Sequence, residues 1–151
     1  MSMEVEKGLL LINGRDMAEL GVFLAETTKD GHKNYDELLK GGETKEVTAV
    51  DFRERVGEEL PEVLDIQLKA RDVTLLFGIV ADNTSEWLQR YKEFRGVLQS
   101  GWLNISLPEL GSVFRFYLKS MPAHSQLSRL KGEGKQVAVM TVTLREPKPV
   151  F

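Results

Sequence analysis

The 151-residue chain contains no cysteine, which excludes disulfide bonds, thiolate catalysis and zinc–thiolate sites. It also lacks a strong excess of either charge, since 20 lysines and arginines against 23 aspartates and glutamates give a net charge of −3. This balance excludes a strongly basic nucleic-acid binder and an acidic disordered chain. The 42% hydrophobic and 28% charged fractions are those of an ordinary globular protein. The length suits one domain, so we predict a single domain over residues 1–151.

Targeting segments and long apolar runs are missing from the sequence as well. Residues 1–7 are polar and acidic, without the basic stretch and apolar core of a signal peptide. No apolar run approaches about 18 residues, the length that a membrane-spanning helix needs. We therefore predict a protein that is cytoplasmic when synthesised and has no membrane partner.

Motifs that carry catalytic or metal chemistry are absent or incomplete. The two histidines, His32 and His124, lie outside any metal-ligand spacing. The segment that starts at Asp30 lacks the glycine and the glutamate that a calcium loop requires at its sixth and twelfth positions. Residues 132–135 lack the serine or threonine that completes a phosphate-binding loop. We therefore predict that the protein is not an enzyme and has neither a cofactor nor a metal site.

Alternation of apolar and polar residues predicts a mainly β protein. Pro122 is expected to end the strand that begins near Val113, because proline has no amide hydrogen to donate. Since most strands follow one another with short connections, we predict an antiparallel β-sandwich or a partly open barrel. The predicted strands cover residues 9–12, 21–25, 47–52, 63–70, 73–80, 103–107, 113–119 and 137–144, with a further short candidate at 126–130.

One helix is predicted over about residues 84–99, packed against the sheet. Asn83, Thr84 and Ser85 offer caps for its start, and Ser100 and Gly101 supply its end. Four hydrophobic side chains recur at spacings of four, three and four, which places them in a narrow arc of the helix. We predict that this core face consists of Trp87, Tyr91, Phe94 and Leu98.

Two features of the sequence are unusual for a protein of this kind. Residues 27–45 have little apolar content and are predicted to form a long polar loop. Gly96 lies on the opposite side of the helix from Trp87, where glycine costs roughly 0.5–1 kcal/mol relative to alanine. It is either a tolerated surface residue or a point where another backbone approaches closely.

The order of elements resembles the virion tail proteins of long-tailed bacteriophages. It is most similar to the N-terminal domain of distal tail proteins and, after that, to tail-tube subunits. The likeness spans most of the chain as an order of elements. It is carried by Leu-Ile-Asn-Gly-Arg-Asp at residues 11–16 with residues 20–22, by the strand pair around residues 71–75, by the helix that opens at residues 85–87 and leads through Tyr91 and Phe94 to Gly101, and by the closing strands at residues 114–117 and 137–144.

The resemblance implies a β-sandwich with one flanking helix, no catalysis, and assembly into a ring that is often hexameric. The protein would be a structural component of a phage or phage-like tail, in the distal ring or the tube. It would join the virion tail after synthesis, with copies of itself and other tail proteins as partners and no specific nucleic acid. The alternative is a small-molecule or peptide-binding β-barrel, which a monomer with a deep apolar pocket would favour.

The resemblance also implies where neighbouring subunits would meet. In related tail folds a long loop between early strands reaches the next subunit, and residues 27–45 occupy that place here. Gly96 is added because a neighbouring backbone would explain a glycine at that position. The candidate interface therefore consists of Asp30, His32, Lys33, Asn34, Tyr35 and Gly96.

Overall fold

The computed structural model describes residues 6–26, 33–45, 50–51, 58–59, 63, 66–127 and 134–149. Within these residues the chain forms short strands first, then two α-helices among longer strands. In chain order the elements are β1 (Leu11–Ile12), β2 (Arg15–Asp16), the 3-10 helix η1 (Met17–Leu20), β3 (Val22–Leu24), α1 (Lys33–Leu39), β4 (Val50–Asp51), β5 (Glu58–Glu59), β6 (Arg71–Ala81), α2 (Thr84–Leu98), β7 (Leu103–Leu107), β8 (Ser112–Gln126) and β9 (Gln136–Glu146).

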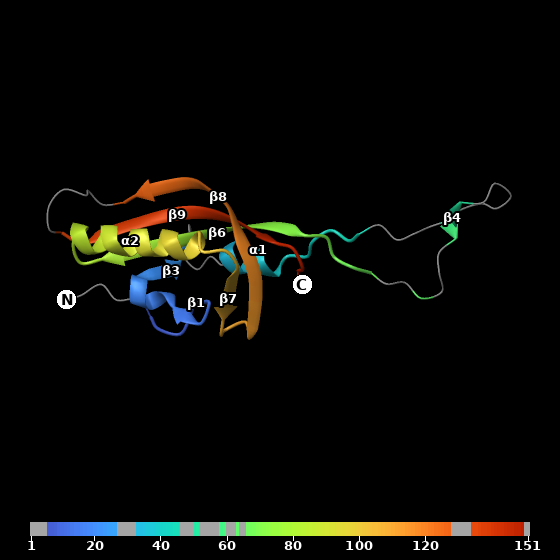
Figure 1. Cartoon of the computed structure of the whole chain (residues 1–151), viewed down its shortest axis with the longest axis horizontal. Coiled ribbons are helices and arrows are strands. Elements are labelled where there is room, and N and C mark those ends of the chain that lie inside the picture. The colour runs from blue at the N-terminus through green and yellow to red at the C-terminus, as the bar shows by residue number, and fades with distance from the viewer. Residues whose placement is uncertain are drawn as a thin grey trace.

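Seven strands form one antiparallel sheet in the order β2–β1–β7–β8–β9–β6–β3, which curls into a half-barrel around α2 (Figure 1). Strand β8 joins its two halves, because residues 112–116 pair with β7 and residues 117–126 pair with β9. Register shifts between Leu118 and Ala123 bend the strand beyond this change of partner. The predicted antiparallel β fold with a flanking helix is confirmed, in the form of the partly open barrel.

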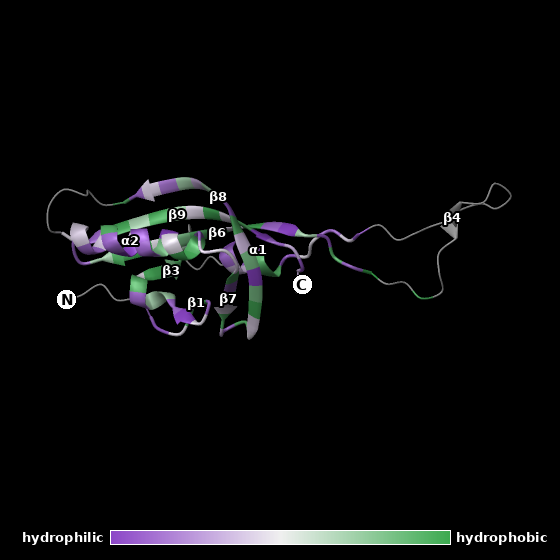
Figure 2. Cartoon of the chain, viewed as in Figure 1, coloured by the Kyte–Doolittle hydropathy of each residue, from purple (hydrophilic) through white to green (hydrophobic). Residues whose placement is uncertain are grey.

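Helix α2 covers the concave face of the half-barrel, close to its predicted bounds. Asn83 caps it by accepting a hydrogen bond from the Glu86 N–H at 2.8 Å. Phe94 meets Phe77 of β6 edge-on, with 5.3 Å between ring centres. Figure 2 shows hydrophobic residues concentrated along β6 and β9 and hydrophilic ones on much of the visible side of α2. The buried side chains of β6 and β9 around this contact include Val73, Leu75, Phe77, Met140, Val142 and Leu144.

The long polar loop predicted over residues 27–45 is wrong in its described part, because α1 occupies Lys33–Leu39, whereas residues 27–32 lie outside the described residues. The prediction of a single helix is therefore wrong as well. The helix is only seven residues long, so its three apolar residues, Tyr35, Leu38 and Leu39, make too short a run for a helical period to stand out in the sequence. In the structure Leu38 is fully buried in the hydrophobic core and Tyr35 packs against that core, and polar contacts to other parts of the chain add to this attachment.

A second, two-stranded sheet formed by β4 and β5 lies apart from the half-barrel (Figure 1). Residues 43–45 and 67–69 run side by side between the half-barrel and this small sheet. The Lys45 N–H donates to the Gln67 carbonyl at 2.7 Å, and the Lys69 N–H donates to the Glu43 carbonyl at 2.8 Å. The half-buried strand predicted over residues 63–70 is wrong in its described part, because these residues lie beyond the sheet that would bury one face.

Pro122 does not end a strand, since β8 continues through it to Gln126. The proline lies within the register shift between Ser120 and Ala123, where regular pairing with β9 is interrupted. A residue without an N–H is tolerated at such an irregularity.

Candidate functional site

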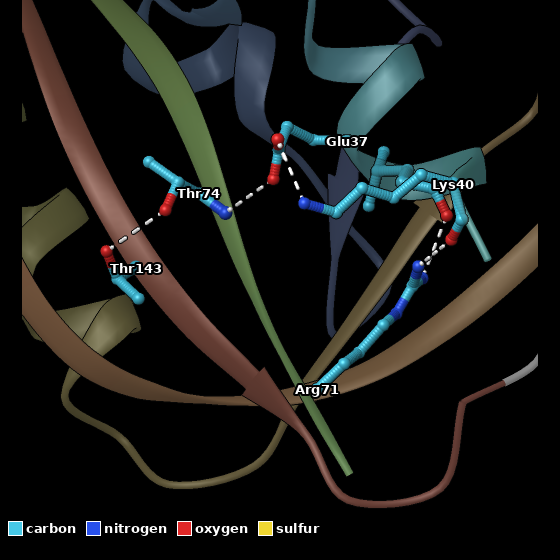
Figure 3. A network of polar contacts seen from close by, with 6 residues as sticks. Glu37, Lys40, Arg71, Thr74 and Thr143 are labelled. Carbon is cyan, nitrogen blue, oxygen red and sulfur yellow. Dashed lines mark hydrogen bonds and ion pairs between the residues drawn. The ribbon is translucent and has the colours of Figure 1, made fainter. Parts of the chain in front are cut away.

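Helix α1 lies at the edge of β6, just beyond the end of β3. The Asn34 side chain is buried, and its Oδ1 accepts a hydrogen bond from the Leu76 N–H at 2.7 Å. Its Nδ2 donates to the Ala25 carbonyl at 2.6 Å. One turn later, Glu37 Oε2 accepts the Thr74 N–H at 3.3 Å (Figure 3). The helix therefore covers a stretch of sheet edge that β3 is too short to pair with.

Arg71 holds the other end of α1. Its Nη2 donates to the Leu38 carbonyl and its Nη1 to the Lys40 carbonyl, both at 2.8 Å (Figure 3). These acceptors belong to the last turn of the helix and the residue after it, where carbonyls have no partner within the helix. The Arg71 Nε donates to Glu146 Oε1 at 2.7 Å, and both side chains are buried. Arg71 thus ties α1 to β6 and β9 at once.

Glu26 and Glu109 complete the attachment of α1. Glu26 accepts the backbone N–H of Lys33 at 2.6 Å, at the first turn of the helix. The Tyr35 hydroxyl donates to Glu109 Oε2 at 2.6 Å, in the turn between β7 and β8. Burial, this hydrogen bond and the negative charges of Glu109 and Glu26 together raise the pKa of Tyr35 to about 12.

The structure describes four of the six residues predicted to form an interface. Asp30 and His32 lie outside the described residues, and Lys33 is exposed. Asn34 must be corrected: its side chain is 1% exposed and hydrogen-bonded within its own chain, so it is not free to contact a neighbour. Tyr35 is half-buried and is also bonded within the chain.

Gly96 is exposed on α2, and a Cβ added to it would meet no heavy atom within 4 Å. It lines a surface depression between α2 and the β1–β2 hairpin. An ion pair between Arg15 and Glu93, at 3.4 Å, also lines this depression. Among the described residues of the subunit, therefore, no neighbouring atom comes so close that this position has to be glycine.

The predicted core face of α2 points into the half-barrel. Trp87, Phe94 and Leu98 are buried, and the Trp87 indole N–H donates to the Ile79 carbonyl at 3.1 Å. Tyr91 is half-buried and stacks on Trp87 with 5.1 Å between ring centres. His124 of β8 packs edge-on against Tyr91 at 5.5 Å.

The sequence analysis missed the residues that hold α1, namely Glu37, Arg71 and Glu146. No local motif marks them, because Arg71 and Glu146 become neighbours only through the register of β6 and β9. Among the described residues, no three histidine, aspartate or glutamate side chains gather where they could bind a metal ion. The described helices include none with the length and apolar character needed to cross a bilayer.

No family model matches the chain, and no curated protein matches it. Among solved structures, the chain is similar to SPP1 Dit (gp 19.1), described as a paradigm of the hub adsorption apparatus in phages that infect Gram-positive bacteria. The TM-score is 0.55 with 11% sequence identity, and the match covers 93% of this chain and 50% of Dit. The chain thus spans about half the length of this neighbour, and at such low identity the likeness shows that the two share a fold.

Proposed function

We propose that the protein is a non-catalytic structural component of a phage or phage-like tail. In this proposal, copies of the chain assemble into a ring around a central channel, together with other tail proteins. The observation that carries the proposal is the fold that 93% of the chain shares with SPP1 Dit. The order of elements in the sequence supports it independently, through its resemblance to distal tail proteins.

The use of buried polar groups also supports a scaffold role. In the described part of the chain, four polar or charged side chains are buried: Asn34, Arg71, Gln136 and Glu146. Each bonds to backbone or to another member of this set, as in Asn34 with Leu76 and Arg71 with Glu146. The bonds of Asn34 and Arg71 join separate segments of the fold, as suits a scaffold.

Of the two tail positions, we favour the distal ring over the tube, because SPP1 Dit is described as part of a hub adsorption apparatus. The protein would be synthesised in the cytoplasm and incorporated into the virion tail. Lys33 and Gly96 remain candidate contacts between subunits in the described region.

Sedimentation velocity and negative-stain microscopy of the purified protein test the proposal. We expect a discrete oligomer that forms as the concentration rises and appears as a ring with a central hole. SPP1 Dit, prepared in the same way, is the matched comparison. A protein that stays monomeric at every concentration tested would contradict ring formation.

A further inference from the structure

The outward face of β7 and the first half of β8 carries exposed aromatic rings around an arginine. Trp102, just before β7, is 47% exposed, and Tyr117 of β8 is 37% exposed. The Arg115 guanidinium lies 4.2 Å from the centre of the Trp102 ring. Tyr117 meets Trp102 edge-on, with 5.8 Å between ring centres. Together with the exposed Val113, these residues form what we name the outer patch.

The backbone beneath the outer patch is held in place by Asn13, in the turn between β1 and β2. Its Nδ2 donates to the Trp102 carbonyl at 3.2 Å, and its Oδ1 accepts the Asn104 N–H at 2.8 Å. The Asn13 N–H also donates to the Asn104 carbonyl at 2.9 Å. A large side chain on fixed backbone, already stacked on Arg115, loses little conformational entropy when a partner covers it.

The charge around the outer patch is unbalanced. Arg115 forms no ion pair with any carboxylate among the described residues. Farther along β8, Lys119 shares the single carboxylate of Asp72 on β6 with Arg145 of β9. Three cations thus accompany one carboxylate, an excess of two positive charges on a chain whose net charge is −3. The rest of the chain therefore carries a net charge of −5, opposite in sign to this face.

The open edges of the half-barrel are poorly suited to contacts between copies. The terminal strands β2 and β3 offer only two and three residues, and α1 covers the part of β6 beyond β3. The second half of β8 lies beyond β7, but it contains Pro122 and two register shifts. Short strands, prolines, bulges and covering helices all hinder the addition of a further strand. Copies of this chain are therefore expected to meet through faces.

We infer that the outer patch is the surface through which one copy of this chain contacts an acidic surface of a second copy. The inference rests on the proposed function, because ring assembly supplies the second copy. Tryptophan, tyrosine and arginine are the residue types that carry most of the energy of protein interfaces. A contact between the patch and a different surface of the next copy is heterologous, the kind that closes into a ring.

The fluorescence of the two tryptophans in the chain can be used to detect this contact. Trp87 is 2% exposed within the subunit, whereas Trp102 is 47% exposed, so acrylamide quenching of dilute protein mainly monitors Trp102. We expect quenching to decrease as the protein assembles, because the partner covers Trp102. The variant Trp102→Phe, which retains only the buried tryptophan, should show weak quenching that does not change with concentration.

A pair of charge-reversal variants tests the electrostatic part of the inference. Arg115→Glu should raise the concentration needed for half-assembly by about tenfold or more, because it sets a negative charge against an acidic surface. Lys135→Glu is the matched control, since it makes the same change of charge at an exposed position just before β9, outside both the outer patch and α2. It should assemble like the wild type, and both variants should retain the melting temperature of the monomer.

Three results would overturn the inference, and they differ in what they say about the ring. If the wild type assembles while Trp102 stays accessible and Arg115→Glu assembles normally, the outer patch is not the interface but the ring proposal stands. If the wild type never assembles, both proposals fail. If poly-L-glutamate shields Trp102 but self-assembly does not, the patch binds a different acidic partner.

Discussion

The Asn34 side chain forms with Leu76 the two hydrogen bonds that a residue of a neighbouring strand would form. Its Oδ1 accepts the Leu76 N–H at 2.7 Å, and its Nδ2 reaches the Leu76 carbonyl at 3.3 Å. A side-chain amide offers the same donor and acceptor as a peptide group. Helix α1 thereby takes over the pairing of β6 beyond the end of β3.

Replacing Asn34 with alanine should lower the free energy of unfolding by about 1–3 kcal/mol, because polar groups at Leu76 and Ala25 lose their partner. Urea denaturation of the purified variant measures this loss. Lys33→Ala removes an exposed side chain from the adjacent position and should change stability by less than about 0.5 kcal/mol. Equal midpoints for the two variants would show that the Asn34 hydrogen bonds contribute nothing measurable.

Tyr35 should make the protein sensitive to high pH. Its pKa is raised to about 12 in the folded state, so the folded state keeps the proton at pH values where an unfolded tyrosine, with a pKa of 10.0, has lost it. The free energy of unfolding should therefore fall as the pH rises from about 10 to about 12. Tyr35→Phe lacks this group, so the stability advantage of the wild type over the variant should shrink across that range. An advantage that stays constant would contradict the raised pKa of Tyr35 and the buried, hydrogen-bonded setting that causes it.

The ion pair of Arg71 should matter far more than that of its neighbour Asp72. Arg71→Met leaves the buried Glu146 carboxylate unpaired and should cost about 3–5 kcal/mol of stability in chemical denaturation. Asp72→Asn breaks only exposed ion pairs and should cost less than about 1 kcal/mol.

The double variant Arg71→Met with Glu146→Leu separates charge burial from the support that Arg71 gives to α1. Removing the second charge should restore part of the lost stability, because no unpaired carboxylate stays buried. A double variant as unstable as Arg71→Met would indicate that the carbonyls of Leu38 and Lys40 depend on Arg71 for most of the effect.

Two substitutions at Gly96 distinguish effects on the stability of the monomer from effects on assembly. Gly96→Ala should raise the melting temperature and add up to about 1 kcal/mol of stability, since its Cβ meets no neighbour within 4 Å. Gly96→Gln should leave the monomer folded but weaken assembly if another subunit packs on this face of α2. Thermal melts and light scattering at matched concentration give both quantities. Assembly of Gly96→Gln equal to that of the wild type would remove this face from the interface.

Helix α2 and the long strands could be predicted because their signals are local. Asn83 caps the helix, and the spacing from Trp87 to Leu98 reveals which side is buried. Alternation likewise marks β9, whose buried residues recur at every second position. A run that is apolar on both faces marks β6, which is buried without interruption from Phe77 to Ala81. The fold class follows from these elements, and the same order of elements carries the resemblance to tail proteins.

The polar site and the outer patch could not be predicted, because their residues meet only through tertiary structure. Asn34 and Leu76 lie in different elements, and the stretch that contains α1 reads as a loop without its partners. Trp102 gains its cationic neighbour Arg115 from the next strand. Burial also reversed the expectation for Asn34, since a polar residue in a polar segment is usually exposed.

The order of strands has a consequence for how the protein folds during synthesis. Strand β1 pairs with β7, and the partners Leu11 and Ser106 are about 95 positions apart along the chain. At about 5–20 residues per second, the ribosome needs about 5–20 s to produce the partner strand after β1 has emerged. During this interval β1 and β2 can form only their own hairpin, and β6 waits in the same way for β9. The half-barrel therefore closes only when most of the chain has left the ribosome.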